Sequence, residues 1–178
     1  MATNVAVFGS SEPLPGDPLY ESARRVGYLL ASEGYGVVSG GYAGVMEGAS
    51  RGAREAGGSA IGVTTRDFGR GPGNPFLSVE HQEPNLFDRT RRLIELSDAY
   101  IILAGKAGTL AEAAFLWALH RAGLLGGKPI VMTGPFWNGF VDDLVRRDLL
   151  GPGQVGATAH AATPEEAVQI VKRLRNSR

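Results

Sequence analysis

The residues best suited to chemistry are a glycine-rich turn at 104–109 and the carboxylate Glu112 that follows it. The turn comes directly after an apolar run and precedes a segment of helical periodicity. A turn of this kind presents backbone N–H groups to an anion, and a carboxylate close by can activate water or stabilise a cationic sugar. We therefore predict a phosphate site made by Gly105, Lys106, Ala107, Gly108 and Thr109.

The segment from Thr109 to Glu112 also fits a purely structural role. A threonine followed three residues later by glutamate has the form of a capping box, in which both side chains accept hydrogen bonds from backbone groups at a helix start. A glutamate engaged in this way does not easily act on a ligand as well. Lys106 either adds a cation to the phosphate site or blocks the close approach that glycine permits. The sequence leaves these alternatives open.

Two further turns follow apolar runs, at Gly9-Ser10-Ser11 and at 39–44. Each turn alone is explained as well by the geometry of a tight connection, but parallel strands would bring all three to one edge of a sheet. The first turn lacks the dinucleotide pattern G-x-G-x-x-G, and the P-loop pattern does not occur, so a smaller phosphate ligand is favoured. The predicted contacts from these turns are Gly9, Ser10, Gly40, Gly41, Gly44 and Met46.

Short apolar runs that alternate with segments of helical periodicity predict the elements that position these turns. We expect strands at 5–8, 36–38, 60–63, 99–103, 129–132 and 155–159, and helices at 20–32, 45–56, 86–96, 109–122, 140–149 and from 163 onward. Residues 64–85 are expected to form a long loop, in which 77–79 is a candidate strand. The order predicts a Rossmann-like three-layer α/β/α fold with a mainly parallel sheet, in a single domain over 1–178.

Bulk properties exclude several classes of function. Eighteen basic and 18 acidic residues balance, so no general affinity for nucleic acid is expected. The chain has no cysteine, and its three histidines, His81, His120 and His160, are too scattered for a metal site. We find no basic leader and no apolar run of membrane-spanning length, so we expect a cytoplasmic protein without a membrane partner.

Four segments of this sequence resemble the LOG family of cytokinin-activating phosphoribohydrolases, long mislabelled as lysine decarboxylases. They are Ser-Gly-Gly-Tyr-Ala-Gly-Val-Met at 39–46, Asp88-Arg89, Ser-Asp-Ala-Tyr at 97–100 and Gly-Lys-Ala-Gly-Thr-Leu-Ala-Glu at 105–112. The resemblance extends from residue 5 to about residue 149. It implies a homodimer without a cofactor that hydrolyses a nucleoside 5′-monophosphate to a free base and ribose 5-phosphate, with Arg89 and Glu112 as catalytic residues.

The sequence departs from the family at several positions. The family pattern P-G-G-x-G-T-x-x-E begins here with Ala104 and has Lys106 in place of a glycine, while Thr90 and Thr64 replace a lysine and a proline. Molybdenum cofactor carrier proteins resemble the same family and bind a phosphate-bearing pterin without turnover. A non-catalytic binding protein for a nucleotide or for the molybdenum cofactor is therefore the alternative. Nothing in the sequence supports a lysine decarboxylase.

The sequence also predicts the surroundings of both tryptophans and of two glycines. We expect Trp117 in the core or at a subunit interface. Trp137 and Asn138 follow a strand at the ligand-facing edge and are candidate contacts to a base. Gly48 and Gly52 are expected to permit close packing against a neighbouring helix or subunit.

Overall fold

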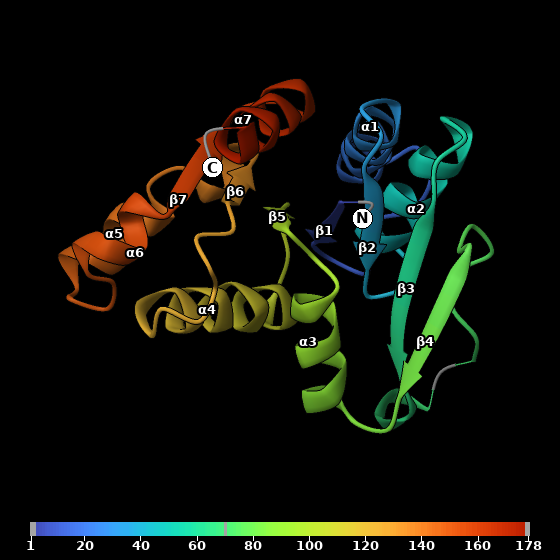
Figure 1. Cartoon of the computed structure of the whole chain (residues 1–178), viewed down its shortest axis with the longest axis horizontal. Helices are drawn as coiled ribbons and strands as arrows, with labels where there is room; N and C mark the ends of the chain where they lie inside the picture. The colour runs from blue at the N-terminus through green and yellow to red at the C-terminus, as the bar shows by residue number, and fades with distance from the viewer. Residues whose placement is uncertain (1–2, 70, 177–178) are drawn as a thin grey trace.

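Parallel strands form one sheet in the computed structural model, which describes residues 3–69 and 71–176 (Figure 1). The strand order is β4-β3-β2-β1-β5-β6-β7, and every neighbouring pair is parallel. The strands are β1 (Asn4–Phe8), β2 (Gly36–Ser39), β3 (Ala60–Thr65), β4 (Val79–Glu83), β5 (Ala99–Ile102), β6 (Ile130–Thr133) and β7 (Thr158–Ala161).

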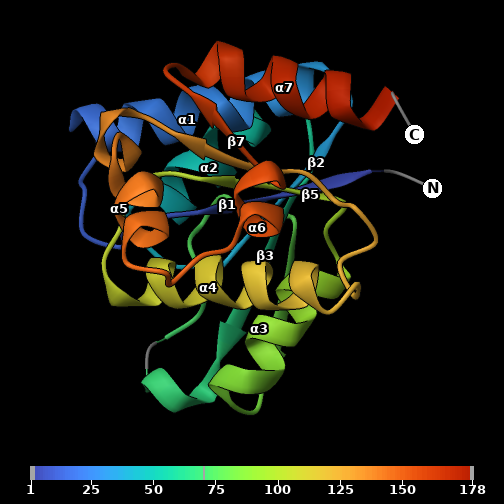
Figure 2. The same ribbon diagram turned by 90° about the vertical axis from the view of Figure 1, so that its left-hand side faces the viewer.

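Helices cover both faces of this sheet (Figure 2). Helices α1 (Pro18–Ser32), α2 (Val45–Glu55) and α7 (Pro164–Asn176) pack on one face. On the other face lie α3 (Leu86–Glu95), α4 (Ala107–Arg121), α5 (Phe140–Arg146) and α6 (Pro152–Gly156). Two 3-10 turns, η1 (Arg66–Phe68) and η2 (Pro135–Trp137), follow β3 and β6. The architecture confirms the predicted Rossmann-like three-layer α/β/α fold.

The chain reverses its direction across the sheet between β1 and β5. From β1 it proceeds through β2 and β3 to β4 at one edge, and α3 then returns it to β5 on the other side of β1. Ligands of open parallel sheets bind at such a switch point, outside the carboxyl ends of the two central strands. The fold therefore directs attention to the turns after Phe8 and Ile102.

Two strands differ from the prediction in their position. Strand β4 covers 79–83 rather than 77–79, and its residues are mostly exposed because it is the edge strand, so it lacks the apolar pattern that marks a strand. The expected strand at 155–159 lies instead at 158–161, because Pro152 opens α6 and the Gln154 side chain accepts a hydrogen bond from the Gly151 N–H. These two differences leave the central strands unchanged.

Glycines permit the close contact between α1 and α2. A Cβ atom at Gly52 would collide with the backbone carbonyl oxygen of Arg24, and one at Gly48 would lie 2.7 Å from that of Tyr20. The expected packing of both glycines against a neighbouring helix is therefore confirmed. Trp117 is buried and its indole N–H donates to the Thr158 hydroxyl at 2.9 Å, which places this tryptophan in the core.

Candidate active site

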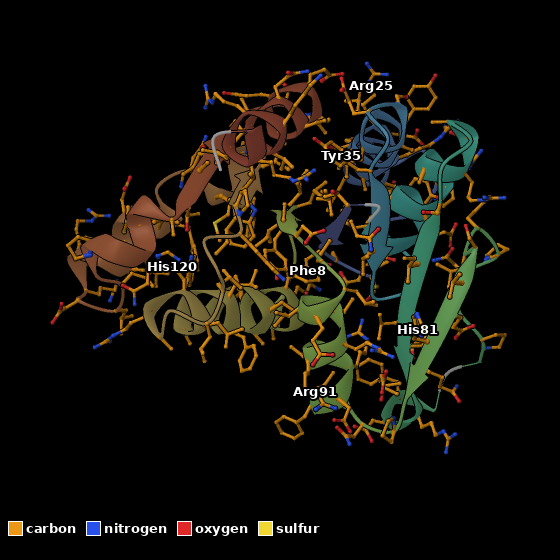
Figure 3. The ribbon with its side chains drawn as sticks, viewed as in Figure 1. Phe8, Arg25, Tyr35, His81, Arg91 and His120 are labelled. Carbon is orange, nitrogen blue, oxygen red and sulfur yellow. The ribbon has the colours of Figure 1, made fainter. Side chains whose placement is uncertain are left out.

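A cleft of about 180 Å³ lies at the switch point, where β1 and β5 end. Strand β1, the loop after it, the turns after β2 and β5, the start of α2, turn η1, and helices α3 and α4 contribute residues to it. Figure 3 shows Phe8, the residue of β1 that lines the cleft, on the side of the sheet that α3 and α4 cover. The lining residues are Phe8, Gly9, Ser10, Ser11, Glu12, Gly40, Tyr42, Met46, Phe68, Arg89, Lys106, Gly108, Thr109 and Glu112.

The loop after β1 is fixed by its own backbone. The Ser10 N–H donates to the Ala104 carbonyl at 3.0 Å, and the Ser10 carbonyl accepts from the Val45 N–H at 2.8 Å. Gly44 must be glycine here, because its φ is +71° and a Cβ atom would meet the backbone of Ser10 and Ser11. The N–H of Val45, the first residue of α2, is therefore already bonded to this loop and is not open to an anion.

Helix α4 begins at Ala107, two residues before the predicted start, with Lys106 as its N-cap. Thr109 is therefore the third helical residue, and no side chain caps this helix, so the predicted capping box does not form. The first α-helical hydrogen bond is donated by the Leu110 N–H to the Lys106 carbonyl. The N–H groups of residues 107–109 precede it, and a helix start of this kind attracts anions.

Arg89 is a buried cation that α3 holds against two other elements. Its Nε donates to the Val63 carbonyl at 2.7 Å, and its Nη2 donates to the Gly40 carbonyl at 3.2 Å. The guanidinium also lies 5.9 Å from the Tyr42 ring centroid and 5.8 Å from that of Phe68. A Cβ atom at position 40 would collide with the guanidinium, so glycine at this position leaves the space that Arg89 occupies.

Glu112 faces this guanidinium from α4. Its Oε1 lies 3.9 Å from Arg89 Nη1, longer than a hydrogen bond, and the two side chains expose only 16% and 7% of their surface. Burial raises the pKa of Glu112 to about 7, although the positive charge of Arg89 acts in the opposite direction. A carboxyl group with this pKa can accept or donate a proton near neutral pH.

Lys106 lies at the mouth of the cleft. Its Nζ forms an ion pair with Glu12 Oε1 at 2.7 Å, and both side chains are largely exposed. The backbone of Lys106 has φ −98°, which any residue adopts without strain, and so the absence of glycine does not distort the turn. The side chain adds a cation to the rim, although Glu12 neutralises it.

Four of the predicted phosphate contacts do not line the cleft: Gly41, Gly44, Gly105 and Ala107. The three glycines shape the turns: Gly41 has φ +78°, Gly44 has φ +71°, and Gly105 packs against the Thr109 side chain. Ala107 is the first residue of α4. The other predicted residues do line the cleft.

The sequence reasoning missed five lining residues, Phe8, Ser11, Glu12, Tyr42 and Phe68. Tyr42 belongs to the turn at 39–44, whereas no pattern in the expected loop 64–85 marks Phe68 as a site residue. Trp137 is fully buried and donates its indole N–H to the Ile102 carbonyl at 3.1 Å. The suggestion that Trp137 contacts a base is therefore wrong.

The described residues contain no cluster of three or more histidine, aspartate or glutamate side chains suited to a metal ion. None of the helices within 3–69 and 71–176 has the length and apolar character needed to cross a membrane.

The fold and the cleft define a Rossmann-like α/β protein whose ligand site is expected at the switch point of the sheet. The model of the SLOG cluster4 family matches residues 2–135, and the chain belongs to that family.

Named relatives point to two kinds of protein. The chain is 32% identical over 165 residues to the cytokinin riboside 5′-monophosphate phosphoribohydrolase of Mycobacterium tuberculosis, covering 87% of this chain and 83% of that protein. It is also similar to the molybdenum cofactor carrier protein of Chlamydomonas reinhardtii, with a TM-score of 0.77, 25% identity and 99% of each chain covered. The molybdenum cofactor binding protein of Rippkaea orientalis has the same fold, with a TM-score of 0.77, 24% identity and 98% of each chain covered.

Proposed function

We propose that this protein is a single-domain nucleoside 5′-monophosphate phosphoribohydrolase, which releases a free base and ribose 5-phosphate. The observation that carries the proposal is the buried pair of Arg89 and Glu112, 3.9 Å apart in a cleft that the start of α4 also lines. The 32% identity to a named phosphoribohydrolase supports the same activity.

In this proposal the substrate phosphate binds at the start of α4. The N–H groups of residues 107–109 and the rim cation Lys106 supply the attraction, while Gly9 and Ser10 form the opposite wall. Gly40 and Met46 contact the ribose side of the ligand, and Gly41, Gly44 and Gly105 hold the turns in shape. With the phosphate bound there, we expect the anomeric carbon of the ribose to lie toward Glu112.

Hydrolysis adds water across the bond between C1′ and the base nitrogen. The base leaves with the electron pair of that bond and takes up a proton, while C1′ gains the hydroxyl oxygen. Ionised Glu112 stabilises the positive charge that develops on the ribose and accepts a proton from the attacking water. Arg89, anchored by two backbone carbonyls, favours the ionised form of Glu112 through its positive charge, which opposes the effect of burial on the Glu112 pKa.

The alternative is a carrier that binds a phosphate-bearing ligand, such as the molybdenum cofactor, without turnover. The ion pair of Lys106 with Glu12 favours the carrier, because Lys106 stands where the pattern of the phosphoribohydrolases has a glycine. The 25% identity to a molybdenum cofactor carrier along nearly the whole chain supports it as well. In this case the phosphate group would occupy the same helix start.

A homodimer is part of the proposal. Phe87 on α3 and Phe115 on α4 expose 88% and 47% of their surface, and such apolar side chains commonly pack against a partner. Sedimentation analysis of the purified chain tests this, since a protein that sediments as a monomer at micromolar concentration contradicts it.

The test of activity is incubation with AMP, GMP, CMP and UMP, followed by chromatography for free base. We expect release by the wild-type protein and a loss of at least roughly 100-fold in Glu112→Gln. Glu95→Gln is the matched control, because this exposed glutamate of α3 does not line the cleft, and it should keep full activity. If no monophosphate is cleaved while a phosphate-bearing ligand binds, the hydrolase proposal fails and the carrier is favoured.

A further inference from the structure

Phe68 is a half-exposed aromatic side chain in the wall of the cleft. Its exposed fraction is 42%, against 6% for the neighbouring Tyr42. The two rings are tilted by 55° with centroids 5.9 Å apart, and Phe68 lies over the Arg89 guanidinium. A large apolar ring that stays open to solvent in a ligand cleft is suited to the flat face of a ligand.

Hydrogen bonds fix the backbone that carries this ring. The Thr65 hydroxyl accepts from the Asp67 N–H at 3.3 Å, and the Asp67 carboxylate accepts from the Leu86 N–H at 2.7 Å. The Tyr42 hydroxyl binds Thr65 twice, donating to its carbonyl and accepting from its N–H. Turn η1 is thereby tied to both α3 and the turn after β2, and the Phe68 ring is a prearranged surface.

In the proposed function, the other parts of the cleft bind the phosphate and the ribose of the nucleotide. The start of α4 attracts the phosphate, and Arg89 with Glu112 faces the ribose, so the base must lie toward the aromatic wall. The cleft has room to extend there, because a second hollow of about 400 Å³ shares Ser11 and Tyr42 with it. That hollow is lined by Ser11, Tyr42, Ala43, Glu47, Pro72 and Asn74.

We propose that Phe68 is the platform on which the nucleotide base stacks. This inference rests on the proposed placement of phosphate and ribose, and it adds the base-binding residue. A purine offers more area to the ring than a pyrimidine does, whereas ribose 5-phosphate offers none.

Calorimetric titration separates stacking from a purely structural role of the ring. AMP, UMP and ribose 5-phosphate are titrated into the Glu112→Gln protein, in which turnover cannot interfere, with and without Phe68→Ala. We expect Phe68→Ala to weaken AMP binding by roughly tenfold, UMP less, and ribose 5-phosphate by less than about twofold. Phe68→Trp should restore AMP binding, and Phe136→Ala, an exposed phenylalanine outside the cleft, should change nothing.

Other results overturn the inference. If Phe68→Ala weakens AMP and ribose 5-phosphate equally, the ring only supports Arg89; if it weakens neither, the base lies elsewhere. Failure of the hydrolase proposal has a different signature, because the wild-type protein then releases no base while the Phe68-dependent preference for AMP persists. No detectable binding of AMP to a folded protein would contradict both proposals.

Discussion

Arg89 Nη1 lies 3.9 Å from Glu112 Oε1, with both side chains almost entirely buried. The guanidinium cannot move far, because the carbonyls of Val63 and Gly40 hold it from β3 and from the turn after β2. A fixed cation at this distance opposes the effect of burial on Glu112, and the resulting pKa of about 7 places the change of charge near neutral pH.

The rate of base release should depend on pH through Glu112. Because the mechanism uses the carboxylate, kcat/KM should rise with pH, reach half of its maximum near pH 7 and level off above it. Initial rates with AMP well below its KM between pH 5 and 9 measure this profile. A rate that is constant down to pH 5 would show that ionised Glu112 is not required.

The same group should make stability depend on pH in the opposite sense from most carboxylates. Its pKa is raised from 4.5 to about 7 on folding, so the folded protein binds more protons between these values. The contribution of Glu112 to the free energy of unfolding is therefore largest below pH 4.5 and is lost as the pH rises to 7. Relative to Glu112→Gln, which has no such titration, the loss should amount to at most about 3 kcal/mol. Urea unfolding of both proteins at several pH values measures it, and parallel curves would contradict the raised pKa.

Gly40→Ala should disable the site without unfolding the protein. The new methyl group would collide with the Arg89 guanidinium and lie 2.6 Å from Met46 Sδ, which displaces Arg89 from Glu112. Misplacement of this size should lower kcat/KM by roughly 100-fold. Gly153→Ala is the control, since a Cβ atom there meets nothing within 4 Å. Equal activity of both variants would show that the position of Arg89 does not matter.

The ion pair at the cleft mouth should affect affinity more than stability. Lys106 and Glu12 are exposed, so breaking their contact should change the free energy of unfolding by less than about 1 kcal/mol. Glu12→Gln frees Lys106 to meet the phosphate and should lower KM for AMP, whereas Lys106→Ala should raise it, and both effects should shrink in high salt. Lys172→Ala breaks a similar pair, with Glu33, on the opposite face of the sheet and serves as control. If Glu12→Gln raises KM, Glu12 itself contacts the ligand.

The sequence predicts those parts of the site whose structure depends on neighbouring residues in the chain. The turns after β1, β2 and β5 are recognisable because each glycine cluster ends an apolar run, and parallel pairing then brings these turns to one edge. Phe68 could not be found in this way. Its position depends on hydrogen bonds that the Thr65 N–H donates to Tyr42 and the Leu86 N–H donates to Asp67, between segments about 20 residues apart.

At the start of α4, a local sequence pattern suggests a structure that does not form. Thr109 and Glu112 fit a local capping pattern, but tertiary contacts place the helix start at Ala107. Thr109 is buried beside Gly105 in the cleft floor, and Glu112 lies a turn further along, where it meets Arg89. The Ser10 N–H donates to the Ala104 carbonyl, so the turn before the helix is held by a segment more than 90 residues away, which a local motif does not take into account.

The pairing of β1 with β5 has a consequence for the order of folding. Val5 lies beside Ala99, so the two halves of the cleft join only when segments more than 90 residues apart have met. Contacts of such long range form slowly and late, because the intervening chain must first lose much of its freedom. Ligand binding during refolding should therefore lag behind the appearance of helical structure, and a bound nucleotide will report on completed folding.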